Sequence, residues 1–316
     1  MSGLKTIRRR ITSVKNTRQI TRAMKLVSAA KLRRAQDAAT GGRAFGDELQ
    51  DLLRTVTKAV PESFSHPLLA PRSVVKNRLV LVVAGERGLC GAYNANVLKA
   101  VTAQEQPSQS SPDLNVAVLP IGKQARSAAK RFGWTISVEP EAWAKEGAVG
   151  EDANRWPAQE MAEWLISAYS SGEFDEVVIY YTKFISAMTQ VVTKEVLLPL
   201  APVAVHTGDE DEAAASAAAS ASSELAANNA AAQTLFDPSP ELLLIKLFSF
   251  LLATKIRQAG LEAKASEHSS RMTAMDSATR NADDLIDKLK LFYNRARQSA
   301  ITRELIDIVG GAEAVK

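Results

Sequence analysis

The sequence predicts an α/β fold. The two ends of the chain form a long antiparallel two-helix coiled coil, and the middle of the chain forms a central α/β domain. Residues 3–59 contain no proline, and residues 241–309 contain no proline and a single glycine. Between them, short apolar runs alternate with helix-forming stretches. We divide the chain into an N-terminal coiled-coil helix (1–60), an α/β domain (75–205), an Ala/Ser-rich segment (206–237) and a C-terminal coiled-coil helix (238–316).

The N-terminal segment shows the periodicity of one long helix. Leu4, Ile7, Ile11 and Val14 recur at spacings of three and four, which places them on a single helical stripe. The three glycines within residues 41–46 are expected to weaken or bend its middle, because each costs about 1 kcal/mol relative to alanine. Pro61 is expected to end the helix.

The central segment begins with an apolar, β-branched run at residues 78–84, which is typical of a strand buried on both faces of a parallel sheet. Strands and helices then alternate, so we expect a compact Rossmann-like α/β domain. The expected strands are 78–84, 114–120, 134–138, 176–181 and 188–198, and the expected helices are 94–103, 123–132 and 155–171.

The Ala/Ser-rich segment differs from its surroundings in composition. A run of acidic residues leads into alanine and serine, and over residues 207–234 Leu225 is the one large aliphatic side chain. Such a stretch buries too little apolar surface to fold alone, so we expect it to be solvated.

The C-terminal segment predicts roughly 100 Å of helix, since each residue adds about 1.5 Å. Pro238 and Pro240 suit its start, and Gly310 and Gly311 are expected to end it. A domain of about 130 residues cannot bury such a rod, so it must pack on the N-terminal helix. The heptad positions of that contact are expected to be Met275, Ala278, Ala282, Leu285, Leu289, Phe292, Ala296 and Ser299.

Charge and cysteine content limit the possible functions. The net charge is only +4, yet every charged side chain before Asp37 is basic, which indicates a face for acidic partners. The single cysteine excludes an intrachain disulfide and a thiol-rich metal cage. No run of about 18 apolar residues occurs, so we expect neither export nor direct membrane insertion.

Several patterns that suggest catalysis or ligand binding have simpler interpretations. Gly85, Gly88 and Gly91 follow a strand, but their spacing differs from the dinucleotide-binding fingerprint. The lysine after Gly122 is followed by glutamine, whereas a P-loop lysine is followed by serine or threonine. The apolar stripe of the basic helix favours a protein partner over nucleic acid. We therefore expect no catalytic residue, no cofactor and no metal site; His66, His206 and His268 stand far apart, and Cys90 has no histidine nearby in sequence.

Three stretches resemble the γ subunit of F-type ATP synthase, its central rotor. The first lies within residues 4–36 and includes Lys5-Thr-Ile-Arg-Arg-Arg-Ile and Gln19-Ile-Thr-Arg-Ala-Met24. The second is Gly85-Glu-Arg-Gly-Leu-Cys-Gly-Ala-Tyr-Asn94. The third is C-terminal: Ser266-Glu-His-Ser-Ser-Arg-Met-Thr-Ala-Met275, then Tyr293-Asn-Arg-Ala-Arg-Gln-Ser-Ala-Ile-Thr-Arg-Glu304 and the residues up to Gly311.

The resemblance implies that the coiled coil stands inside a hexamer of α and β subunits. The α/β domain would grip the ε subunit and the ring of c subunits, on the cytoplasmic face of the bacterial inner membrane. Proton flow would turn the shaft and drive the catalytic β subunits through ATP synthesis. The cysteine pair that makes chloroplast members redox-sensitive is absent.

The resemblance also implies site residues. Rotor contacts to the catalytic subunits would come from Met24 and Lys25 on the first helix and from Arg271, Gln298, Thr302 and Glu304 on the last. The C-terminal tip, with Ile301, Leu305, Ile308 and Val309, would turn in a hydrophobic bearing. Two other functions remain open: a coiled-coil scaffold that does not rotate, and a nucleotide-dependent enzyme built on the α/β domain.

Overall fold

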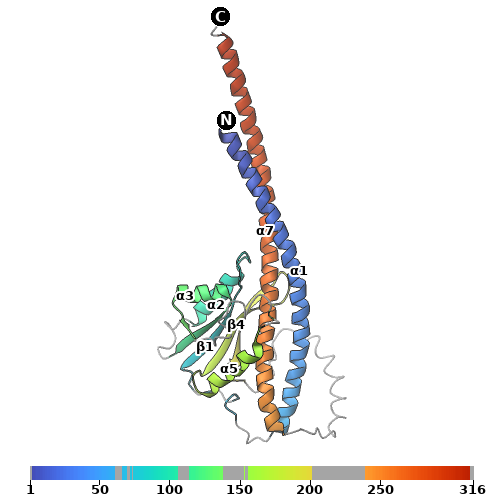
Figure 1. The fold of residues 1–316 in the computed structure, drawn as a ribbon, viewed down its shortest axis with the longest axis vertical. Helices are drawn as coiled ribbons and strands as arrows, with labels where there is room; N and C mark the ends of the chain where they lie inside the picture. The colour runs from blue at the N-terminus through green and yellow to red at the C-terminus, as the bar shows by residue number, and fades with distance from the viewer. Residues whose placement is uncertain are drawn as a thin grey trace, which may run out of the picture.

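A computed structural model of the chain describes residues 2–60, 66–69, 72, 74–105, 114–137, 153, 156–200 and 239–313. Two long helices form a shaft, and an α/β domain lies against one side of its lower half (Figure 1). The elements are α1 (Ser2–Ala59), β1 (Asn77–Val83), α2 (Tyr93–Glu105), β2 (Asn115–Ile121), α3 (Lys123–Phe132), β3 (Thr135–Ile136), α5 (Ala158–Ser170), β4 (Glu176–Phe184), β5 (Gln190–Leu198) and α7 (Pro240–Glu313).

The sheet has the strand order β3-β2-β1-β4-β5. Strands β1 to β4 are parallel, and β5 pairs antiparallel with β4 at one edge. Residues 79–83 of the central strand β1 are fully buried, as their unbroken apolar run predicts. Edge strand β5 begins with alternating exposure, which agrees with its alternating polar and apolar residues.

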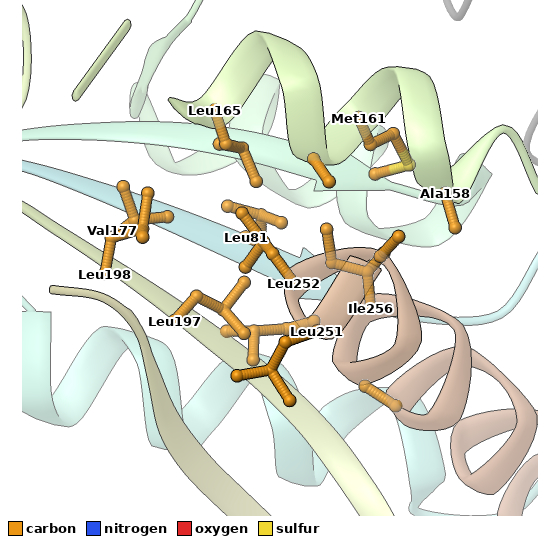
Figure 2. Close-up of a cluster of buried hydrophobic side chains, with 14 of the residues drawn as sticks. Leu81, Ala158, Met161, Leu165, Val177, Leu197, Leu198, Leu251, Leu252 and Ile256 are labelled. Carbon is orange, nitrogen blue, oxygen red and sulfur yellow. The ribbon is translucent and has the colours of Figure 1, made fainter. Parts of the chain in front are cut away.

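The two faces of the sheet are covered differently. Helices α2 and α3 pack on one face around Val80 and Val82 of β1. On the other face, α5 and the lower part of α7 enclose Leu81, and Figure 2 shows Met161 of α5 and Ile256 of α7 converging there. The long helix therefore packs on the domain as well as on α1, a second role that its length alone did not predict.

The shaft is an antiparallel pair, as predicted. Polar contacts between α1 and α7 run in opposite sequence order: Arg18 pairs with Asp283, and Lys25 pairs with Asp276. Between them, the hydroxyl groups of Thr21 and Thr279 lie 2.8 Å apart. These contacts fix the register of the two helices.

The predicted seam has two columns of residues, and the structure confirms the one that contains Met275 and Ala282 but not the one that contains Leu285 and Phe292. Met275 and Ala282 are buried, but Leu285 is 45% exposed and Phe292 58% exposed, and Ser299 is also exposed. The buried neighbour of Leu285 is Ile286, so the second column of the seam runs one residue later than predicted. The reason is that Thr279 belongs to this column through its hydrogen bond to Thr21, and a search for apolar residues overlooks a threonine.

The glycines end neither helix. Helix α7 continues through Gly310 and Gly311 to Glu313, so the expectation that these residues end it is wrong. Glycine weakens a helix but keeps the N–H group that proline lacks. Helix α1 is likewise continuous through residues 41–46, and a Cβ atom on Gly42 would overlap the side chain of Gln258 on α7. Gly42 therefore lies in the contact between the two helices.

The one glycine of α7 before the C-terminal pair marks another close contact. A Cβ atom at Gly260 would lie 2.6 Å from the ring of Trp156, which is buried beside α5. Trp156 thus packs within the core of the domain, and Trp164 and Trp134 pack against its two core clusters. Trp143 lies outside the described residues, as does the Ala/Ser-rich segment 206–237.

The Gly260 contact gives a stability prediction. Gly260→Ala should lower the free energy of unfolding by about 1–2 kcal/mol, because overpacking against Trp156 outweighs the gain in helix propensity. Gly41→Ala is the matched control: nothing lies within 4 Å of the position that its new Cβ atom would take, so the same change should stabilise the chain slightly. Urea unfolding followed by circular dichroism measures both; equal effects of the two substitutions would contradict this packing.

The corrected seam gives a second prediction. Ile286→Ala should destabilise the chain by about 2–4 kcal/mol, because it removes a buried side chain from the helix contact. Leu285→Ala should cost less than about 1 kcal/mol, since much of that side chain is already in water. The same unfolding measurement distinguishes the two registers. If Leu285→Ala lowers the free energy of unfolding more than Ile286→Ala does, the register predicted from the apolar heptads is the correct one.

Candidate functional site

The upper end of α7 is a single helix that extends beyond the first residues of α1 (Figure 1). Ile301, Leu305 and Ile308 recur there at spacings of four and three and so share one face, and Ile308 is 68% exposed. Ile306 is exposed as well, while the side chain of Val309 lies outside the described residues. An apolar helix face in water is typical of a surface that a partner covers.

The predicted polar contacts of α7 lie at the same end. Gln298 and Thr302 are exposed and one helical turn apart, so their side chains point to one side of the helix. Glu304 is also exposed. The structure thus brings these three residues together with the apolar tip.

Met24 and Lys25 lie further down, where α1 runs beside α7, and both are half-buried. The ammonium group of Lys25 binds the carboxylate of Asp276, and this hydrogen bond holds the pKa of Asp276 below its ordinary value. Next to them, Leu26 is 64% exposed. This part of α1 therefore combines an ion pair within the shaft with an outward apolar side chain.

The basic character of the first helix is retained at its surface. Arg8, Arg9, Arg10, Lys15 and Arg22 are all exposed along the upper shaft. Their charges give this half of the shaft a positive face, which suits acidic protein surfaces.

Arg271 is placed differently from the other predicted contacts. It is 8% exposed and donates hydrogen bonds to Glu267 Oε1 at 2.7 Å and to the carbonyl oxygens of Arg87 and Gly88 at 3.3–3.4 Å. Against the effect of burial, the charges of Lys264 and Arg271 hold the pKa of Glu267 below its ordinary value. Arg271 therefore joins α7 to the loop between β1 and α2.

The contact between α7 and the loop after β1 lies where a nucleotide would bind in a related fold. Open α/β sheets bind nucleotides beyond the carboxyl ends of their parallel strands. Here that edge of β1 faces α7: a Cβ atom on Gly85 would lie 3.2 Å from the carboxyl carbon of Glu267. The chain's own helix packs against the glycine loop where a ligand would bind in such a domain.

The other candidate groups are placed as packed side chains. Cys90 is 2% exposed, and burial raises its pKa despite the hydrogen bond that the Asn94 amide donates to its sulfur at 3.1 Å, so the environment disfavours a reactive thiolate. Burial lowers the pKa of His268 to about 4, and the ring of His66 packs on Phe248. His206 lies outside the described residues.

Metal sites and membrane spans are both missing from the described part of the chain. No group of three or more His, Cys, Asp or Glu side chains there could hold a metal ion. None of the helices in those ranges has the length and apolar character needed to span a membrane.

Sequence reasoning missed a set of buried polar residues on α7. Every residue from 261 to 269 is buried, although Glu262, Lys264, Ser266, Glu267 and Ser269 are polar or charged. Their signal in the sequence is a helical stretch with polar side chains on all sides, which alone predicts a solvated helix. Contacts with the distant α/β domain and with α1 bury them.

Comparisons with known proteins agree with this architecture. A family model described as ATP synthase matches residues 3–315. The ATP synthase gamma chain of Chlorobium phaeobacteroides is 40% identical, with 100% of this chain and 99% of the relative covered. That of Desulforamulus reducens is 39% identical, with both chains covered completely.

Solved structures share the fold at lower identity. A chain of the Euglena gracilis mitochondrial ATP synthase, in a structure of OSCP, F1 and c-ring, aligns with a TM-score of 0.60 and 18% identity, covering 99% of this chain and 95% of that one. A chain of the Tetrahymena thermophila central stalk and c-ring aligns with a TM-score of 0.53 and 22% identity, covering 82% and 99%. The full-length match to the family and the identity shared with curated relatives along their whole length show that this chain belongs to the family of ATP synthase gamma chains.

Proposed function

We propose that the chain is the central-stalk rotor subunit of a proton-translocating F-type ATP synthase. The observation that carries the proposal is the free upper end of α7, an exposed apolar helix face with no other described element of this chain around it in Figure 1. Such a face requires a bearing supplied by other subunits. Membership of the gamma-chain family supports a hexamer of α and β subunits as that bearing.

The lower half of the molecule supplies the other connection. In the proposed assembly the α/β domain and the lower shaft hold the ε subunit and the c-ring. Structures of similar fold are described as central stalk with c-ring and as F1 with c-ring, which supports this placement. The chain would then be peripheral, on the cytoplasmic face of the bacterial inner membrane.

The proposed contacts to the catalytic subunits come from two levels of the shaft. Met24 and Lys25 act at the lower level, and the exposed Gln298, Thr302 and Glu304 act just below the tip. Hydrogen bonds from such groups can form and break as the shaft turns. For Arg271 the bonds within the chain support a role inside the rotor.

In this proposal the chain carries no chemistry of its own. Rotation of the asymmetric shaft would force each catalytic β subunit in turn to bind ADP and phosphate, form ATP and release it. The packing of α7 on the β1–α2 loop supports the view that the α/β domain binds no nucleotide. Isothermal calorimetry of the purified chain with ATP would detect an enzyme-like site.

The apolar tip gives the first functional prediction. Leu305→Asp should lower ATP synthesis in membrane vesicles on the order of tenfold, because a carboxylate inside an apolar bearing is poorly solvated. Leu305→Met keeps the apolar surface and should retain near-normal synthesis. Both variants should be compared at equal amounts of assembled complex. If the Asp variant synthesises ATP at the normal rate, the tip has no hydrophobic bearing.

A cross-link separates a rotor from a scaffold that does not move. Leu26→Cys places a thiol on the exposed face of α1, while the native Cys90 is too buried to compete. Tethering this thiol to a surrounding subunit through a cleavable linker should abolish sustained ATP hydrolysis, and reduction of the linker should restore it.

The control for this experiment is Leu26→Ser treated with the same reagent, which should hydrolyse ATP throughout. A static scaffold would tolerate the tether, so continued hydrolysis by the cross-linked complex would favour that alternative.

A further inference from the structure

We infer that residues 262–271 of α7, here called the clamp segment, form a two-sided grip that carries torque between the shaft and the α/β domain. The inference rests on the proposed rotor function and identifies the residues that make the rotor stiff. Its basis is a run of buried polar side chains. The serines bond to backbone carbonyl oxygens and to Gln190 of the domain, while Lys264 and Arg271 bind Glu267 within the helix and Arg271 also reaches the loop after β1.

One side of the clamp segment consists of serines. Ser266 Oγ donates to the carbonyl oxygen of Thr182 on β4 at 3.0 Å, and Ser269 Oγ donates to that of Ala187, between β4 and β5, at 2.7 Å. Both serines are fully buried. Gln190 adds a further bond, donating from its amide to Ser269 Oγ at 3.3 Å. This serine side therefore holds the end of the β4–β5 hairpin.

The other side consists of charged residues. Lys264 and Arg271 both bind Glu267, at 3.1 Å and 2.7 Å, and Arg271 reaches onward to the carbonyl oxygen of Gly88. Because Glu267 also lies close to Gly85, the charged side contacts the loop that follows β1 near its start and at its middle.

Helical geometry places the two sides opposite each other. Successive residues of an α-helix are rotated by about 100°, so residues two apart differ by about 200°. Ser266 and Lys264 are such a pair, and so are Ser269 and Arg271. Holding a helix on opposite sides resists rotation about its axis, because a turn must break bonds on both sides at once.

Hydrogen bonds suit this task better than apolar packing. Burial of apolar surface is non-directional, so packing by leucines alone defines the rotation of a helix about its axis less sharply than hydrogen bonds do. Hydrogen bonds weaken steeply as their angle changes, and a buried group that loses its partner costs about 1–3 kcal/mol. The clamp segment thus supplies the directional resistance that the apolar contact of α7 with the sheet lacks.

The second helix of the shaft is fixed at the same level. Arg43 of α1 donates to Glu262 Oε1 on α7 at 3.0 Å and to the carbonyl oxygen of Phe184 at the end of β4, also at 3.0 Å. One guanidinium group therefore connects both helices and the sheet. The two helices of the shaft and the domain meet in one joint.

The test measures rotor stiffness directly in the assembled complex. The hexamer is fixed to a surface, a bead is attached to Lys99→Cys on the exposed side of α2, and the angular spread of the bead is recorded without ATP. Ser266→Ala with Ser269→Ala should widen this spread, with stiffness falling on the order of twofold, because one side of the grip is lost. Gln190→Ala, a milder change at the edge of the joint, should widen it in the same direction.

Two controls separate a torque joint from general destabilisation. Ser277→Ala makes the same chemical change at an exposed position of α7 outside the clamp segment and should leave the spread unchanged. Val118→Ala on β2 weakens the core of the α/β domain away from the joint and off the helix that carries the bead, and should lower thermal stability without widening the spread.

The outcomes are distinguishable. If the bead on the otherwise unchanged rotor does not turn when ATP is added, the proposed function itself fails. If that bead turns but the serine and Gln190 variants spread no more than Ser277→Ala, the clamp is overturned while the rotor stands. Should the double serine variant fail to assemble, the Gln190 variant decides the question alone.

Discussion

The structure depends on the burial of one very long helix. Helix α7 has 74 residues, which corresponds to about 110 Å, several times the radius of a domain of this size. No single neighbour can cover it, so its surroundings change along its length. The lower part packs on the sheet, α5 and α1, the middle on α1, and the top on nothing in the described part of this chain. Each environment demands different side chains, and the sequence of α7 changes accordingly.

The packing around the lower part of α7 joins the α/β domain to the shaft. Helix α7 completes the core on one face of the sheet with apolar side chains such as Leu252 and Ile256, so part of the domain's core comes from the shaft. Above that core, the polar clamp segment runs along the carboxyl edge of β1 and β4. A fold that commonly receives a ligand at this edge here receives a helix of its own chain.

The surroundings of the upper part of α7 agree with what membership of the family implies about its residues. The residues implied by the resemblance fall into two groups once their surroundings are known. Gln298, Thr302, Glu304 and the apolar tip are exposed on a helix with no described neighbour, as contacts to other subunits require. Arg271 is enclosed by the domain. A motif shared along a family identifies an important residue, but the partner of that residue follows from the fold.

The sequence by itself determined the elements: two long helices free of internal proline, a buried central strand, the α/β alternation between them, and the family to which the motifs point. These features depend on local periodicity and on backbone restrictions, and both are set by residues that are close together in the sequence. Tertiary structure decided the seam column with Thr279 and Ile286, the passage of α7 through its terminal glycines, and the burial of the clamp segment. Those features depend on partners far away along the chain, such as Arg43 and Glu262, which are 219 positions apart. A polar side chain is equally suited to water or to such a partner, and only the folded chain supplies the partner.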